Sequence, residues 1–116
     1  KTNTPLQALV LQNDVQVLEA ARVLAQRSIK EQPDNPKFVE DLFKRILVRS
    51  PRKEELLTLN TYYHSAFDQY TNDLESAEKL LAAGDYEQID VDPAKAAALM
   101  LTAQVIYNLD ETITKE

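Results

Sequence analysis

The stretch DPAKAAALMLTAQVIYNL, residues 92–109, decides the fold of this chain. Asp92 can cap a first helical turn and Pro93 suits the first helical position, so the sequence predicts a helix that begins here. At 100° per residue, Leu99, Met100 and Leu101 point to three different faces of that helix. A helix that is apolar nearly all round is usually buried. We therefore expect the other helices to pack around it.

Proline, Asx and glycine residues mark the ends of the other expected helices. Thr4 and Gln7 have the spacing of a capping box, with a proline between them at the first helical position. Asn13-Asp14 indicates a turn whose side chains cap the next helix. Gly84, the single glycine, is a natural left-handed stop. The predicted helices span residues 4–12, 15–31, 35–49, 51–72, 73–83 and 92–109, with a further turn at 110–115.

Length and composition favour one helical domain. A chain of 116 residues has the usual size of a single domain. It contains one glycine and five prolines, and a β fold rich in hairpins needs more glycines for its turns. The sequence thus predicts an all-α fold, a compact bundle of about five to six helices with a buried C-terminal helix. The first residue is Lys1 rather than Met, so we expect the single domain 1–116 to be the C-terminal fragment of a larger protein.

Charge and cysteine content exclude several classes of function. The formal charge of −6 disfavours binding to nucleic acid and to anionic membranes, because both reward a positive surface. No apolar run approaches the roughly 20 residues that span a bilayer. Without cysteine the chain has no thiolate ligand or attached haem. No cofactor is expected.

The titratable residues offer weak candidates for chemistry. His64 is the only histidine, and Asp68 follows it at i+4, but a zinc site needs three or four ligands. The carboxylate neighbours Glu40 with Asp41, Asp73 with Glu75, and Asp110 with Glu111 do not face one another on a helix, as a glycosidase pair must. We interpret them as solvated helix surface, predict no catalytic residue and no metal site, and lean against an enzyme.

Polar groups at helix ends and tyrosines form the better constellations. The possible binding or structural motif consists of Thr4, Gln7, Asn13, Asp14, Asn108 and Glu111. Capping is the favoured reading of the Asx residues, because they usually satisfy backbone groups at helix ends. Four tyrosines could line a sugar or peptide groove, although packing with the hydroxyl at the edge is favoured: Tyr62, Tyr63, Tyr70 and Tyr107.

Three stretches of the chain together resemble one known family. They are TNTPLQAL at residues 2–9 with Asn13-Asp14 and Glu19-Ala20-Ala21 after it, Arg49-Ser50-Pro51 with Glu54-Glu55-Leu56, and Asp92-Pro93-Ala94 with residues 108–111. In that order they are similar to the C-terminal part of the domain of unknown function 1553 family, the planctomycete secreted-type domain. This domain occurs in large proteins that often also carry a planctomycete cytochrome c-type domain.

The resemblance implies an exported protein, periplasmic or at the cell surface, with further domains upstream. Two hypotheses follow. In the first, the chain is a non-catalytic helical accessory or interaction domain whose partner is the upstream part of its own polypeptide. Val15 and Val23 motivate this hypothesis, because they fall outside the apolar stripe of the helix predicted at 15–31. In the second, Asn108 and Glu111 complete a polysaccharide-binding or hydrolase site whose other side lies upstream, with carbohydrate as the ligand.

Overall fold

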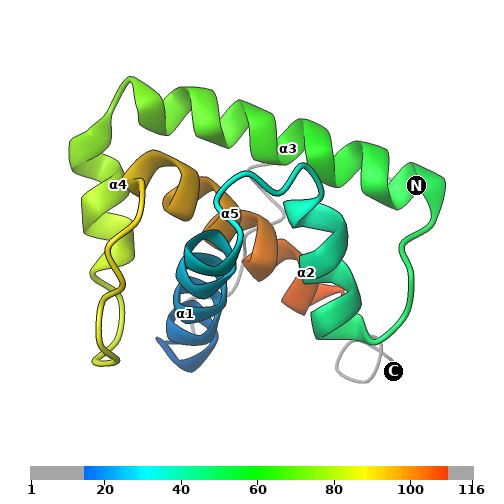
Figure 1. The fold of residues 1–116 in the computed structure, drawn as a ribbon, viewed down its shortest axis with the longest axis horizontal. Helices are drawn as coiled ribbons and strands as arrows, with labels where there is room; N and C mark the ends of the chain where they lie inside the picture. Colours follow the sequence, from blue (N-terminus) through cyan, green and yellow to red (C-terminus); the bar gives the residue numbers. More distant parts are fainter. Residues whose placement is uncertain (1–14, 110–116) are drawn as a thin grey trace.

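The computed structural model describes residues 15–109, which form five α-helices and their connections (Figure 1). The helices are α1 (Val15–Glu31), α2 (Phe38–Leu47), α3 (Lys53–Thr71), α4 (Leu74–Leu81) and α5 (Pro93–Asn108). The prediction of an all-α fold is confirmed. None of these helices is both long enough and apolar enough to cross a bilayer within residues 15–109.

Helix α5 is the centre of the fold, as its sequence predicts. It contacts each of the other four helices, and Figure 1 shows it passing through the middle of the arrangement. Residues 96–100 are fully buried. Three of these are alanines, whose small side chains let neighbouring helices approach the α5 backbone closely, while Leu99 and Met100 fill the space between them.

Each surrounding helix turns a short apolar face toward α5. Apolar residues spaced three and four positions apart predict these faces, and the buried residues of α2 follow that spacing closely. The buried apolar residues outside α5 are Ala21, Ala25 and Ile29 of α1, Phe38, Val39, Leu42 and Phe43 of α2, Leu59, Tyr62, Tyr63 and Ala66 of α3, and Ala77 and Leu81 of α4. Together with α5 they form a single core.

The predicted start of α3 and the predicted side-chain cap of α5 need correction. Helix α3 begins at Lys53 rather than Pro51, because the carboxylate of Glu55 accepts a hydrogen bond from the backbone N–H of Arg52 at 2.8 Å and so caps the helix there. Helix α5 begins at Pro93 as predicted, yet the side chain of Asp92 makes no capping hydrogen bond. Its backbone carbonyl accepts from the N–H of Ala96 instead, at 2.9 Å.

Helix α2 is shorter than the predicted range of 35–49. It starts at Phe38, and the Asn35 side chain accepts from the backbone N–H of Lys37 at 2.8 Å just before it. It ends at Leu47 because Val48 is left-handed, with φ of 58°, and its N–H donates to the carbonyl of Lys44 at 2.9 Å. A β-branched residue rarely adopts this conformation, so Val48 is not recognisable in the sequence as the residue that ends α2.

The connection between α4 and α5 also departs in part from the prediction. Gly84 is left-handed as expected, with φ of 81°, although α4 already ends at Leu81. From the sequence we expect the large apolar residues Leu74 and Tyr86 to pack on the core. Both expectations are wrong, since Leu74 is 48% exposed and Tyr86 is 51% exposed. The predicted helix 4–12 and the turn 110–115 lie outside the described residues.

Candidate functional site

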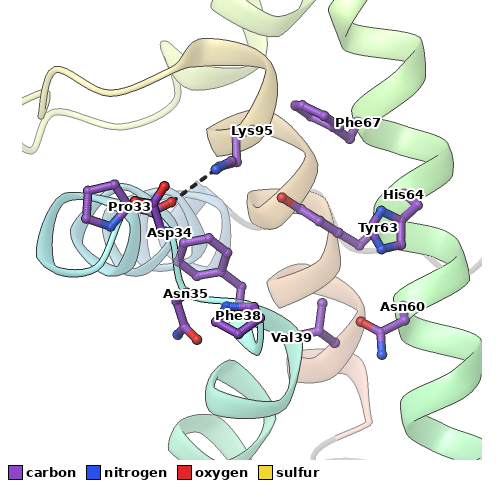
Figure 2. Close-up of a pocket in the computed structure, with 11 residues that line it drawn as sticks. Pro33, Asp34, Asn35, Phe38, Val39, Asn60, Tyr63, His64, Phe67 and Lys95 are labelled. Atoms are coloured by element: carbon purple, nitrogen blue, oxygen red, sulfur yellow. Dashed lines mark hydrogen bonds between the residues drawn. The ribbon is translucent and has the colours of Figure 1, made fainter.

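A groove of about 380 Å³ lies between α3, the α1–α2 connection and the first turns of α2 and α5 (Figure 2). We call it the aromatic groove. Residues 33–36 form one wall, and Lys95 of α5 closes one end. The lining side chains from α2 and α3 are Phe38, Val39, Asn60, Tyr63, His64 and Phe67. Its size falls in the range of about 300–1,000 Å³ that is usual for small-molecule sites.

The aromatic rings of the groove pack on one another along α3. The rings of Tyr63 and Phe67 stack with their planes 9° apart and their centroids 6.2 Å apart, and His64 meets the Tyr63 ring edge-on at 5.2 Å. Burial, with a smaller contribution from the negative charge of Asp92, raises the pKa of Tyr63 to about 12. The Tyr63 hydroxyl therefore stays protonated at neutral pH and can both donate and accept a hydrogen bond.

Lys95 joins two walls of the groove. Its Nζ donates to the carbonyl of Pro33 at 3.1 Å, drawn as a dashed line in Figure 2, and lies 5.5 Å from the centroid of the Phe38 ring. The ammonium is thus held by a backbone dipole and an aromatic face together. This contact fixes the α1–α2 connection against the first turn of α5.

A buried arginine holds the α4–α5 connection against α1. Arg22 is fully buried, and its guanidinium donates to the carbonyls of Ala83 at 3.0 Å, Tyr86 at 2.6 Å and Glu87 at 3.2 Å. It also donates to Oε1 of Gln26 at 2.9 Å. Carbonyl oxygens carry partial negative charge, so these three acceptors stabilise the buried positive charge of Arg22.

Two neighbours of Arg22 complete this arrangement, which we call the Arg22 clamp. Gln26 accepts from the N–H of Ile89 at 3.3 Å and donates to Gln88 at 3.0 Å. The carboxylate of Glu19 accepts from the N–H of Asp85 at 2.8 Å and from that of Tyr86. One helix face therefore satisfies both the donors and the acceptors of a connection more than 60 residues away in sequence.

A second clamp, the Arg49 clamp, joins α2 to α3. The Arg49 guanidinium donates twice to the Glu55 carboxylate, at 3.1 Å from each nitrogen, and lies 4.9 Å above the centroid of the Phe43 ring. The Arg49 hydrogen bonds, with help from Arg52, hold the pKa of Glu55 below its usual value despite partial burial. This bidentate pair gives a structural role to the Arg-Ser-Pro and Glu-Glu residues that sequence reasoning singled out.

A second groove, of about 420 Å³, runs along the outer face of α1. We call it the α1 groove. Its apolar lining is Ala20, Val23, Leu24, Tyr86 and Tyr107, and Gln16, Glu19 and Arg27 line its polar edge. Ala20 and Tyr86 are exposed, whereas Val23, Leu24 and Tyr107 are half-buried. The off-stripe Val23 of the sequence is thus part of an accessible apolar surface.

A comparison of the sequence with models of known protein families identifies the family of this chain. The family model described as "PSD1: Protein of unknown function (DUF1553)" matches residues 1–63, just over half of the chain. The chain belongs to this family. Neither curated proteins nor solved structures gave a match. The matched segment contains α1, α2 and the first half of α3, and with them the side chains of both clamps from Glu19 to Glu55.

Five of the six predicted site residues of this DUF1553 chain lie outside the residues that the structure describes. Thr4, Gln7, Asn13, Asp14 and Glu111 lie outside residues 15–109. Asn108 is the last residue of α5 and is half-buried, and it lines neither groove. Whether these residues cap helices or complete a glycan or hydrolase site stays a prediction.

The other candidates within residues 15–109 lie on helix surfaces and at helix ends, and the pair Asp110 and Glu111 lies outside the described residues. Within residues 15–109 no group of three or more histidine, aspartate or glutamate side chains could hold a metal ion, and His64 is exposed. Glu40 pairs with Lys44 at 3.4 Å, and Glu75 pairs with Lys79 at 3.9 Å. Asp41 accepts from Asn35 at 2.8 Å, and Asp73 caps α4 by accepting from the N–H of Ser76 at 3.2 Å.

The two clamps were not predicted from the sequence, and of the two grooves only the tyrosines were named as possible lining residues. Tyr62 and Tyr63 are buried, and Tyr70 and Tyr107 are half-buried, so the packing role favoured for them holds. Tyr63 and Tyr107 nevertheless each line a groove. Arg22 carried one available signal, because Arg22, Gln26 and Ile29 lie at i, i+4 and i+7 beside the buried alanines of α1.

Proposed function

We propose that this chain is a non-catalytic accessory domain of a larger exported protein and that it packs against the upstream part of the same polypeptide. The α1 groove carries the proposal. It combines an exposed tyrosine, Tyr86, with half-buried Val23, Leu24 and Tyr107, the mixture of aromatic and aliphatic groups that is typical of protein interfaces. Gln16, in the first turn of α1, lines this groove, so the groove lies beside the point where the upstream polypeptide joins the described helices.

The use of the buried polar groups supports an accessory role over catalysis. Arg22 and Gln26 are nearly inaccessible and bind backbone groups of the α4–α5 connection, and Glu55 is engaged by Arg49 and Arg52. Active sites usually hold polar groups that face a cleft. In this domain the side chains of Arg22, Gln26 and Glu55 fix the positions of connecting segments instead. Export is part of the proposal through the family alone, and fractionation of the source cells tests it.

The test compares the 116-residue chain with the polypeptide extended upstream. We expect the extension to raise the midpoint of thermal unfolding of this domain. We also expect it to increase protection of the backbone amides of residues 20–27 against hydrogen exchange. In the extended protein, Val23→Ser should lower stability by about 1 kcal/mol more than in the 116-residue chain, because only there is the valine covered on both sides.

Leu57→Ser is the matched control. Leu57 is 68% exposed on α3 and lines neither groove, so its replacement should change the stability of both proteins equally. Equal midpoints with and without the upstream polypeptide would contradict the proposal. So would an effect of Val23→Ser that is the same in both proteins.

A further inference from the structure

The aromatic groove has the composition of a ligand site rather than of a packing defect. Its floor is formed by the Tyr63, Phe67 and Phe38 rings, and its rim carries the amide of Asn60 and the imidazole of His64 (Figure 2). Tyr63 and Phe38 are almost entirely buried, whereas Asn60 and Phe67 are partly accessible and His64 is exposed. An apolar floor with a few convergent polar groups is the usual form of a small-molecule site.

The fixed charges of the groove cancel. Asp34 contributes one negative charge and Lys95 one positive charge, and with His64 neutral the remaining lining groups are uncharged at pH 7. The ammonium of Lys95 is already held by the Pro33 carbonyl and the Phe38 ring. A ligand with a net charge therefore gains little from the groove itself, and an anionic one is also repelled by the net charge of −6.

The rim offers donors and acceptors in comparable number. The Asn60 amide, the Tyr63 hydroxyl and the His64 imidazole each provide both, and Asp34 accepts. A partner matched to such a rim carries many groups that both donate and accept, which is the property of hydroxyl groups. A partner matched to the floor carries a flat C–H face that can lie against an aromatic ring.

We propose that the aromatic groove binds a neutral, polyhydroxylated ligand, a segment of an uncharged glycan, with a sugar face against Phe67 and its hydroxyls on Asn60 and His64. This goes beyond the proposed docking of the α1 groove. The two proposals concern different surfaces, so either can fail alone. Asn60 and His64 lie one turn apart on α3 and line the same side of the groove, as Figure 2 shows.

The experiment is a titration of the ¹⁵N-labelled 116-residue chain, followed by amide and aromatic chemical shifts. The probes are soluble uncharged hexasaccharides of glucose, mannose and xylose, an oligogalacturonate of equal length, and decaproline. We expect at least one uncharged hexasaccharide to cause saturable shifts confined to residues 33–38, 60–67 and 95. Asn60→Ala and His64→Ala should each weaken that binding about fivefold or more, the loss expected for one hydrogen bond to the ligand.

Two neighbouring substitutions are the matched controls. Thr61 and Ser65 are exposed, follow the tested residues directly on α3 and do not line the groove, so Thr61→Ala and Ser65→Ala should leave binding unchanged. The proposal is overturned if no uncharged hexasaccharide gives saturable shifts, or if the shifts fall outside the groove. It is also overturned if the oligogalacturonate or decaproline binds more tightly, or if the controls weaken binding as much as the tested variants.

Discussion

Replacing Arg22 by methionine should remove the clamp that holds the α4–α5 connection on α1. Methionine keeps most of the volume and the flexibility of the arginine stem but donates no hydrogen bond. The variant loses the donors to the carbonyls of Ala83, Tyr86 and Glu87 and to the side chain of Gln26. We expect the α4–α5 connection to lift from α1 while the five helices remain.

The magnitude follows from the four hydrogen bonds that are lost. Each one involves a charged donor and is worth about 1.5–3 kcal/mol, but the values do not add, because a connection that lifts exposes its carbonyls to water. Each neutral acceptor that stays buried without its donor costs about 1–3 kcal/mol, so we expect a total loss of about 3–5 kcal/mol for the variant. For a domain of roughly this size that loss lowers the midpoint of thermal unfolding by more than about 10 °C.

The assay is urea and thermal unfolding followed by circular dichroism at 222 nm, with hydrogen exchange at residues 83–89. Glu87→Ala is the control, because it removes a side chain of the same connection but keeps the carbonyl that Arg22 binds. It should change stability by no more than about 0.5 kcal/mol. Arg22→Lys should fall between the two, since one ammonium cannot replace a fork that binds four acceptors. A loss below about 1 kcal/mol for Arg22→Met would refute this reasoning.

Three further predictions concern single residues. Val48→Gly should stabilise the protein by about 1 kcal/mol in urea unfolding, because valine is left-handed there and 86% exposed. Glu55→Gln should make the free energy of unfolding depend less on pH between pH 7 and pH 3. Because the pKa of Glu55 is lowered in the folded protein, its pairing with Arg49 contributes fully to stability above the usual value of 4.5. That contribution is lost as the pH falls through the lowered pKa. Ultraviolet titration should find two tyrosines, Tyr62 and Tyr63, that ionise near pH 12, because burial raises the pKa of each to about 12.

Local signals in the sequence predicted the helices well. The bounds of α1 were predicted as they are found, and Pro93 marked the start of α5, because proline and Asx residues restrict the backbone at their own positions. The burial of α5 followed from an apolar surface with no polar face. The errors lie where side-chain contacts decide where a helix begins. Glu55 accepts from the N–H of Arg52 and pairs with Arg49, and these contacts hold Ser50-Pro51 outside α3.

The grooves and clamps were harder to predict because they depend on which side chains meet across the fold. An arginine beside an apolar stripe is normally read as surface, and the burial of Arg22 depends on a connection that begins about 60 residues later. Tyr86 was expected on the core for its aromatic ring. Its backbone, bound by Arg22 and Glu19, fixes the connection instead and leaves the ring exposed.

The side chains of the Arg22 clamp lie in the half of the chain that the family model matches. Residues 1–63 supply the side chains of the clamp, Glu19, Arg22 and Gln26, whereas the α4–α5 connection supplies mainly backbone groups. Any residue provides a carbonyl and any residue except proline provides an N–H, so the connection can change its side chains and keep its place. The residues of α1 have no such freedom. The sequence requirement of this contact therefore falls on the matched half, and the large effect expected for Arg22→Met beside the small one for Glu87→Ala tests that asymmetry directly.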